Sequence, residues 1–171
     1  MKISKTKLDD ATLKQLIDLS LIWEKEENVY GYRANRKEDI EGNDIYIAQE
    51  NGEIIGYLFG HVEKAEKLSS VIPSGSKCFE IMEIYVKKEY RCKGIGKKLF
   101  SALEEDSDCD YLILATASKN YKSILHFYID EIGMNFHSAM LYKKETVQIN
   151  CTVTVIIRSY CRNLRHQRSC V

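Results

Sequence analysis

Six residues near the middle of the chain combine two glycines with basic side chains, a composition that suits anion binding. Residues 91–96 read Arg-Cys-Lys-Gly-Ile-Gly; a strand-like apolar run, 79–86, precedes them, and apolar residues at helical spacing follow them. The glycines therefore fall where a strand passes into the first turn of a helix. The N–H groups of that turn lack intrahelical partners and lie at the positive end of the helix dipole, so they attract phosphate. The basic side chains around the turn are Arg91, Lys93, Lys97 and Lys98.

Two common glycine-rich loops do not match this segment. A Walker loop requires a glycine five residues before its Gly-Lys pair, and Ser or Thr after the lysine. Arg91 and Lys98 hold those two positions here. A dinucleotide-binding loop requires a third glycine, at the position of Leu99. Both types of nucleotide loop are therefore excluded.

The segment resembles the acyl-CoA pyrophosphate loop of the GCN5-related N-acetyltransferases, the GNAT superfamily. That loop reads Arg/Gln-x-x-Gly-x-Gly/Ala between a strand and a helix, and Arg91, Gly94 and Gly96 fill its three fixed positions. Residues 84–90 are also similar to the family's fourth strand and the turn after it. The resemblance implies acyl-CoA contacts on this strand, in this turn and on a later helix. The implied contact residues are Ile84, Tyr85, Val86, Arg91, Cys92, Lys93, Gly94, Ile95, Gly96, Lys97, Asn120 and Tyr128.

The order of expected elements over residues 1–145 also resembles the GNAT fold. Hydrophobic patterning predicts strands at 2–7, 45–49, 53–62, 79–86, 111–117 and 135–143, and helices over about 10–27, 36–41, 95–106 and 121–131. Asn51-Gly52 predicts a two-residue hairpin. We expect an α/β domain with a mixed central sheet of about six to seven strands and about four helices. The resemblance implies that two of its strands, 79–86 and 111–117, splay apart at the acyl-CoA site.

Composition describes one globular domain and argues against several other classes. The chain has 171 residues, of which 44% are hydrophobic and 29% charged. It has no apolar run of membrane-spanning length and no apolar signal segment after Met1, so we expect a cytoplasmic protein without membrane contact. The six cysteines and four histidines lack metal-ligand spacing, so we expect no metal. We expect a monomer or a homodimer.

Charge changes abruptly near the C-terminus. Residues 1–145 contain all 25 acidic residues and carry a net charge of −4, whereas residues 146–171 contain four arginines and no acidic residue. A nucleic-acid or membrane patch is one interpretation of this basic segment, but four arginines give only a small footprint. We therefore expect no nucleic-acid partner and interpret 146–171 as an extension appended to the domain 1–145. Residues 147–157 alternate in polarity, which predicts one more strand.

The resemblance implies that Tyr128 is the catalytic acid. Residues 120–128 are similar to the family's Asn-x-x-small-x-x-x-aromatic-Tyr pattern, in which the tyrosine hydroxyl points at the CoA sulfur and the asparagine, here Asn120, assists the site. Five steps separate Tyr128 from Gly133, one more than the family's usual spacing, so the helix end is expected to bulge. The alternative is a core tyrosine that packs beside Phe127.

Two glutamates on the central strand are candidates for the base that deprotonates an amine. Glu80 lies eleven residues before Arg91, the position of the catalytic glutamate in some histone-type members of the family. Glu83 is the second candidate; three residues apart, the two face opposite sides of a regular strand, and Glu83 would gain from a bulge. The alternative is that both are strand charges without a catalytic role. A glutamate that several members carry on the next strand is absent, since Ala115 stands there.

The resemblance implies transfer of an acetyl group from acetyl-CoA to a primary amine, by direct attack in a ternary complex. The Val86 amide would face the thioester carbonyl. Acidic and aromatic residues after the first helix favour a small cationic acceptor: they are Glu24, Glu26, Glu27, Tyr30 and Tyr32. A protein N-terminus or lysine as acceptor, and a non-catalytic acyl-CoA-binding sensor module, remain as alternatives.

Overall fold

A mixed five-stranded sheet forms the centre of the structure, a computed structural model that describes residues 1–67 and 71–141. The strands are β1 (Lys2–Thr6), β2 (Asp44–Glu50), β3 (Glu53–Lys64), β4 (Lys77–Val86) and β5 (Tyr111–Ile113), and they lie in the order β1-β2-β3-β4-β5. The first four pair antiparallel, and β5 pairs parallel to β4. The expected α/β class and the mixed sheet are confirmed.

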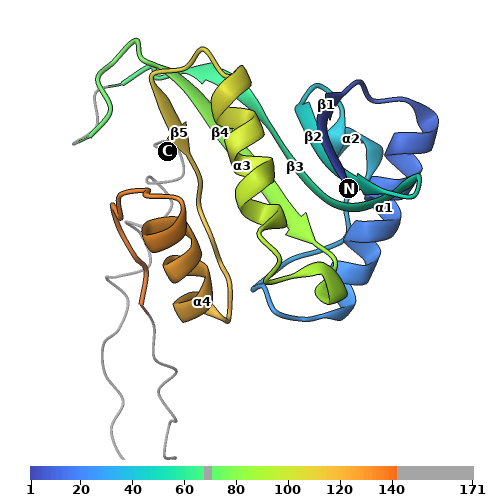
Figure 1. Cartoon of the computed structure of the whole chain (residues 1–171). Helices are drawn as coiled ribbons and strands as arrows, with labels where there is room; N and C mark the ends of the chain where they lie inside the picture. The colour runs from blue at the N-terminus through green and yellow to red at the C-terminus, as the bar shows by residue number, and fades with distance from the viewer. Residues whose placement is uncertain (68–70, 142–171) are drawn as a thin grey trace, which may run out of the picture. The chain divides into compact units, whose positions relative to one another are not determined.

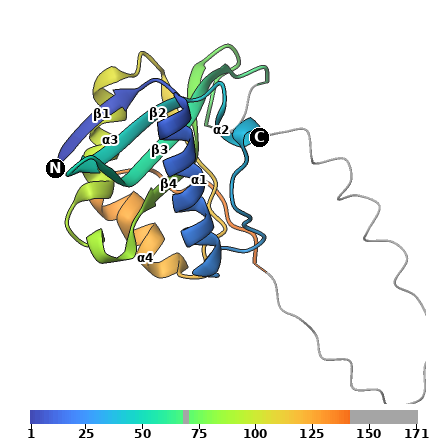
Figure 2. The same ribbon diagram turned by 90° about the vertical axis from the view of Figure 1, so that its right-hand side faces the viewer.

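Helices cover both faces of this sheet (Figures 1 and 2). One core cluster joins the sheet to α3 (Ile95–Asp106) through Ile95, Leu99, Phe100 and Leu103, which lie at helical spacing. The other joins the opposite face to α1 (Asp10–Lys25) and α2 (Lys37–Ile40). The last helical segment within the described residues is α4 (Tyr121–Leu125), continued by a π-helical turn, His126–Glu131. These four helices match the number expected.

Local sequence signals account for the ends of several helices and strands. The Asp9 side chain accepts a hydrogen bond from the Thr12 amide at 2.7 Å and caps α1. Asn51 and Gly52 both adopt positive φ, 53° and 84°, which is the turn geometry that joins β2 to β3 as a tight hairpin. Gly133, with φ 86°, follows the π-helical turn.

The sheet has fewer strands than the six to seven expected. Five lie in the described residues, and 135–141 form no strand there. The pattern at 135–143 was read from polarity alone, whereas a strand also needs a neighbour that offers its backbone groups, and β5 is paired over only three residues. Residues 142–143 and the predicted strand 147–157 lie outside the described residues.

The chain divides into two compact units, Met1–Phe136 and His137–Val171. The first contains every helix and strand named above. Of the second, residues 137–141 are described, and they contain neither helix nor strand. Over the described ranges, none of the helices combines the length and the apolar character needed to cross a bilayer.

Candidate active site

The turn between β4 and α3 presents unsatisfied backbone N–H groups, as the glycine pattern predicted. Gly94 precedes α3 with φ 73°, and among the described residues no side chain caps this helix end. Cys92 also adopts a left-handed conformation, φ 58°, which is uncommon for a residue with a Cβ. Cys92, Lys93 and Lys97 are exposed. The first turn of α3 can therefore accept an anion from solvent.

Arg91 links this turn to β4 and to the end of α1 through hydrogen bonds. Its Nε donates to the Val86 carbonyl at 2.8 Å, and a terminal nitrogen bonds a Glu26 carboxylate oxygen at 2.7 Å. The guanidinium also lies over the Tyr85 ring, 5.4 Å from its centroid. The Tyr85 hydroxyl donates to the same Glu26 oxygen at 2.9 Å. Arg91 thus positions the turn against the ends of β4 and α1, and its predicted contact with acyl-CoA stays a prediction.

The parallel ladder between β4 and β5 stops early and leaves one edge of β4 open. Its three rungs end at Glu80 and Ile113, although β4 continues to Val86. The Lys87 amide donates to the Ile55 carbonyl on the β3 side. Because successive residues of a strand direct their backbone groups to opposite sides, the N–H groups of Ile84 and Val86 point away from β3, toward the open edge.

The chain after β5 is held by a different partner, which keeps the two strands apart. The Tyr30 amide donates to the Ala117 carbonyl at 3.0 Å, and the Lys119 amide donates to the Asn28 carbonyl at 2.8 Å. Val29 and Ser118 form an isolated bridge between these bonds. The expected strand 111–117 is shorter, Tyr111–Ile113, and the loop after α1 binds Ala117 and the two residues that follow it.

A bulge in β4 places both candidate glutamates on the same face of the sheet. The pairing of β3 with β4 shifts between Phe59 and Gly60, so that Met82 is an extra residue. Opposite faces were expected only for a regular strand, and the bulge from which Glu83 was expected to gain is present. Gly60 makes the bulge possible, since a Cβ there would lie 2.1 Å from the Glu80 carbonyl oxygen. A glycine inside a strand pattern was the signal for it.

Glu83 is the candidate base whose carboxylate is held by side-chain hydrogen bonds. Its Oε2 accepts hydrogen bonds from the Tyr57 hydroxyl and the Asn35 side-chain amide, both at 2.8 Å. Burial raises the pKa of Glu83 above its ordinary value, although these two bonds oppose the shift. Burial and the nearby Glu83 charge also raise the pKa of Tyr32, whose buried hydroxyl has no hydrogen-bond partner among the described residues.

Asn35 is held in place from the first helix. Its backbone amide donates to the Ser20 hydroxyl at 2.9 Å, and that hydroxyl donates to the Ile17 carbonyl at 2.8 Å. Asn35 and Ser20 are both buried. No sequence motif identified Asn35, because its contact with Glu83 joins residues 48 positions apart.

An acidic cleft of about 550 Å³ opens beside Glu83. It is lined by Asn35, Glu38, Asp39, Glu41, Gly42, Asn43, Phe59, His61, Met82 and Glu83. The acidic residues expected at the end of α1 lie elsewhere: Glu24 and Glu27 line a second hollow of about 420 Å³, and Glu26 binds Arg91. The acidic run around α2 was the missed signal, since its position against β4 depends on tertiary packing.

Tyr128 lies in the π-helical turn, so the expected bulge at this helix end is present. The Ile132 amide donates to the Phe127 carbonyl, five residues back, at 3.0 Å. Tyr128 packs against the core cluster that contains α3 and contacts the Phe127 ring edge-on, with centroids 5.1 Å apart. Burial raises the pKa of Tyr128 to about 12, and its hydroxyl has no hydrogen-bond partner within the described ranges.

Gly96 lets the turn at residues 91–96 pack closely against the helical segment that contains Phe127. A Cβ at Gly96 would lie 3.2 Å from the Phe127 ring, so the absence of a side chain lets the ring pack against the start of α3. Asn120, at the start of α4, is exposed, and its carbonyl accepts the Ile124 amide at 3.2 Å. The structure thus brings the turn and the Phe127–Tyr128 pair together. The catalytic and acyl-CoA roles of the residues named from the sequence remain predictions.

The mixed sheet, the parallel ladder that ends early and the uncapped turn before α3 agree with the resemblance to the GNAT acetyltransferases. The sequence profile described as "Acetyltransferase (GNAT) family" matches residues 13–134. The chain therefore belongs to this family, which confirms the expected class of transferase.

Relatives of known sequence or structure agree with this assignment. Over 64 residues the chain is 38% identical to an "Uncharacterized N-acetyltransferase in pepI 3'region" of Lactobacillus delbrueckii subsp. lactis; the match covers 37% of this chain and 35% of that protein, about a third of its length. Aminoglycoside N-acetyltransferase AAC(6')-Iy, solved in complex with CoA, superposes with a TM-score of 0.56 at 18% identity, covering 85% of this chain and 100% of that one.

Two further solved structures share the fold at similar levels. The aminoglycoside acetyltransferase meta-AAC0020, from an uncultured soil metagenomic sample and in complex with trehalose, gives a TM-score of 0.61 at 19% identity, covering 85% of this chain and 96% of that one. AAC(6')-IG from Acinetobacter haemolyticus gives 0.56 at 16% identity, covering 86% and 99%. At these identities the likeness establishes the fold.

Proposed function

We propose that this chain is an acetyl-CoA-dependent N-acetyltransferase that acetylates a primary amine of a small cationic molecule in a ternary complex. The observation that carries the proposal is the open edge of β4, whose last residues lead directly into the uncapped turn before α3. A strand edge offers backbone hydrogen bonds to an extended amide-containing arm, and the helix end offers N–H groups to a pyrophosphate. Acetyl-CoA carries both parts.

Acetyl transfer also requires stabilisation of the oxyanion, deprotonation of the amine and protonation of the departing thiolate. A separate group of the site would meet each of these three requirements. The Val86 N–H, directed toward the open edge, stabilises the oxyanion that forms on the thioester carbonyl. Glu83 takes a proton from the substrate ammonium, so that the neutral amine can attack the carbonyl carbon. The positively charged nitrogen of the tetrahedral adduct then loses a second proton to solvent, and Glu83 also returns its proton to solvent. When the C–S bond breaks, Tyr128 gives its hydroxyl proton to the departing thiolate, and solvent then reprotonates Tyr128. The products are the N-acetyl amine, free CoA and one proton.

Glu83 suits the role of base better than Glu80 does. Its raised pKa brings the carboxylate closer to the operating pH, where a general base is most effective. Tyr57 and Asn35 both bind Oε2, and these two hydrogen bonds fix the orientation of the carboxylate.

The cleft beside Glu83 favours a cationic acceptor. Glu38, Asp39 and Glu41 line it together with Glu83. Two of the four are paired with a cation: Asp39 with Arg33 at 2.7 Å and Glu41 with Lys37 at 3.7 Å. The remaining negative charge attracts an amine and raises its local concentration. The aminoglycoside acetyltransferases among the structural neighbours are compatible with an acceptor of this class.

An acceptor screen tests the proposal. The full chain is mixed with acetyl-CoA and a panel of amines that includes aminoglycosides, polyamines, amino acids and lysine-containing peptides, and free thiol is measured over time. We expect thiol release that requires a polycationic small amine and a matching acetylated product by mass spectrometry. Thiol release only with the lysine-containing peptides would mean that the acceptor is a protein amine and not a small cationic molecule. Tight CoA binding without release for any amine would instead identify a non-catalytic binding module.

A further inference from the structure

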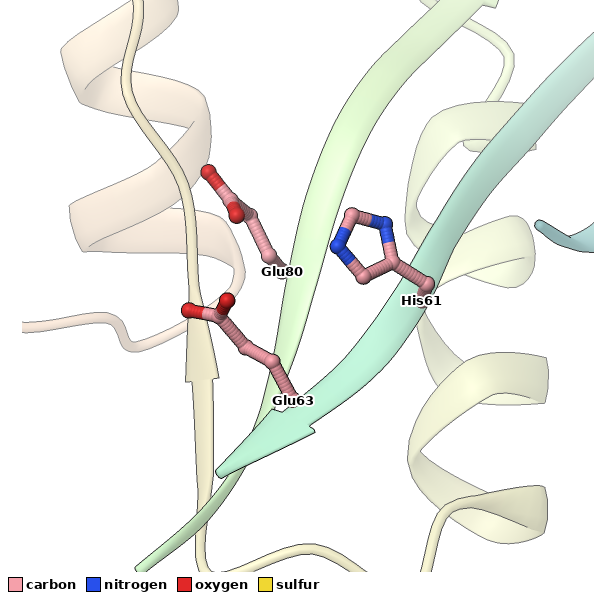
Figure 3. A group of neighbouring side chains, drawn as sticks. All are labelled: His61, Glu63 and Glu80. Carbon is pink, nitrogen blue, oxygen red and sulfur yellow. The ribbon is translucent and has the colours of Figure 1, made fainter. Parts of the chain in front are cut away.

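We propose that His61, Glu63 and Glu80 form a binding site for a divalent metal ion such as Zn²⁺. His61 and Glu63 lie on β3, and Glu80 lies opposite His61 on β4. Each residue offers one ligand atom, and these atoms lie within 4.8 Å of one another. Figure 3 shows both carboxylates extending alongside the His61 ring. Strand pairing creates this group, which has no ligand spacing in the sequence.

The hydrogen bonds around His61 set its tautomer in favour of metal binding. The Asn43 side-chain nitrogen donates to the carbonyls of Asp39 and Ile40 at 3.2 and 3.1 Å, so its Oδ1 is the atom that faces His61 Nδ1 at 3.1 Å. An amide oxygen can only accept, and therefore Nδ1 carries the proton. In neutral His61 the lone pair then lies on Nε2, which faces the two glutamates (Figure 3). Metal-binding histidines commonly have such a partner on the second nitrogen.

Within residues 1–67 and 71–141, the two carboxylates have no compensating cation. Over the described residues, neither Glu63 nor Glu80 forms an ion pair with Lys or Arg. Like charges at this separation repel, and a divalent ion placed between them would remove that repulsion. Glu63 is exposed while His61 and Glu80 are half-buried, so the ion has a path from solvent.

The spacing allows an ion to bind with side-chain movement alone. Ligand atoms of a tetrahedral zinc site lie about 3.4 Å apart at bond lengths of about 2.1 Å. Rotation of the two glutamate side chains can close the gap from 4.8 Å. Three protein ligands leave one position for water. The bound ion would join β3 to β4 at Glu80, the last rung before β4 separates from β5.

Calorimetric titration with Zn²⁺ tests this site, using the full chain with its thiols first blocked by iodoacetamide. Blocking is needed because thiolates bind zinc strongly. We expect one zinc equivalent that His61→Ala and Glu63→Gln each weaken at least tenfold. Asn43→Ala should weaken it about 10- to 100-fold, since it removes only the group that orients the ligand. Zinc should also raise the melting temperature of the wild type and not that of His61→Ala.

His126→Ala is the matched control. His126 is exposed and also lies near two carboxylates, but each ring nitrogen faces a different one, at 2.6 Å for Asp130 and 3.7 Å for Glu131. We expect this variant to bind zinc like the wild type. Two results would overturn the proposal. One is an equal zinc affinity for the wild type and Glu63→Gln, and the other is loss of the bound zinc ion in His126→Ala but in no other variant. Glu63→Gln keeps the test valid if His61→Ala fails to fold, and zinc binding needs neither acetyl-CoA nor turnover.

Discussion

Substitution of Glu83 by glutamine separates the chemistry of this residue from its packing. Tyr57 and Asn35 both donate to Oε2 of Glu83, so an amide oxygen at the same place can accept both hydrogen bonds. We expect the free energy of unfolding to change by no more than about 1 kcal/mol, the size of one net hydrogen bond. Loss of a general base lowers kcat by about 10²- to 10⁴-fold. That factor corresponds to about 3 to 5 kcal/mol of barrier.

The pH profile distinguishes a base from a structural carboxylate. Because burial raises the pKa of Glu83, the wild-type kcat/KM should increase with pH through a value above that of an ordinary glutamate. Glu83→Gln should lose this acidic limb. Stability changes in the opposite direction: a raised carboxyl pKa stabilises the fold at low pH, and this contribution is lost as pH rises through the pKa of the folded state. Glutamine should remove that dependence.

The assay is steady-state thiol release with the best acceptor from the screen, with acetyl-CoA affinity measured separately by calorimetry. Glu80→Gln is the comparison variant, since Glu80 lies on the same strand and, after the bulge, on the same face. If Glu83→Gln stays within threefold of the wild type and keeps the acidic limb, while Glu80→Gln loses it, the assignment of the base is refuted. An affinity for acetyl-CoA that falls with kcat would show a structural effect instead.

Four further predictions concern the other parts of the site. Gly96→Val should lower stability by about 1–3 kcal/mol in urea unfolding, because its methyl groups overlap the Phe127 ring; an unchanged midpoint would mean that the ring moves freely. Tyr128→Phe should lower kcat without changing acetyl-CoA affinity, and an unaltered rate would remove Tyr128 from the acid role. Acetyl-CoA should protect the exposed Cys92 thiol from alkylation, and alkylated protein should bind CoA more weakly; equal alkylation rates with and without CoA would contradict this. Truncation after Glu145 should leave folding and activity unaltered, as measured by circular dichroism and thiol release, whereas loss of either would show that residues 146–171 belong to the domain.

Features encoded over a few residues could be predicted from the sequence. The hairpin at Asn51-Gly52 and the turn at Gly94 depend on local backbone preferences, and each is found where the sequence placed it. The extra residue before Gly133 correctly indicated an irregular helix end, which the structure resolves as a π-helical turn. These signals fixed the position of the candidate acyl-CoA turn and of Tyr128 relative to the elements that carry them.

Features that depend on contacts between distant segments were not predicted. The chain after β5 bonds to the loop after α1 at residues 117–119, which polarity patterns do not encode. The face on which Glu83 lies depends on a register shift against β3. The partners of Glu83, Tyr57 and Asn35, come from two other parts of the chain. The proposal of Glu83 as the base therefore rests on features of the three-dimensional structure.

Binding of acetyl-CoA along the open edge of β4 and at the turn after it is tested most directly by hydrogen–deuterium exchange with and without acetyl-CoA. Acetyl-CoA should slow exchange of the Ile84 and Val86 amides, which point away from β3, and of the amides at the start of α3. The hairpin around Asn51-Gly52 should exchange at the same rate in both samples. Saturating acetyl-CoA that leaves exchange across residues 84–97 unchanged would contradict the proposed site.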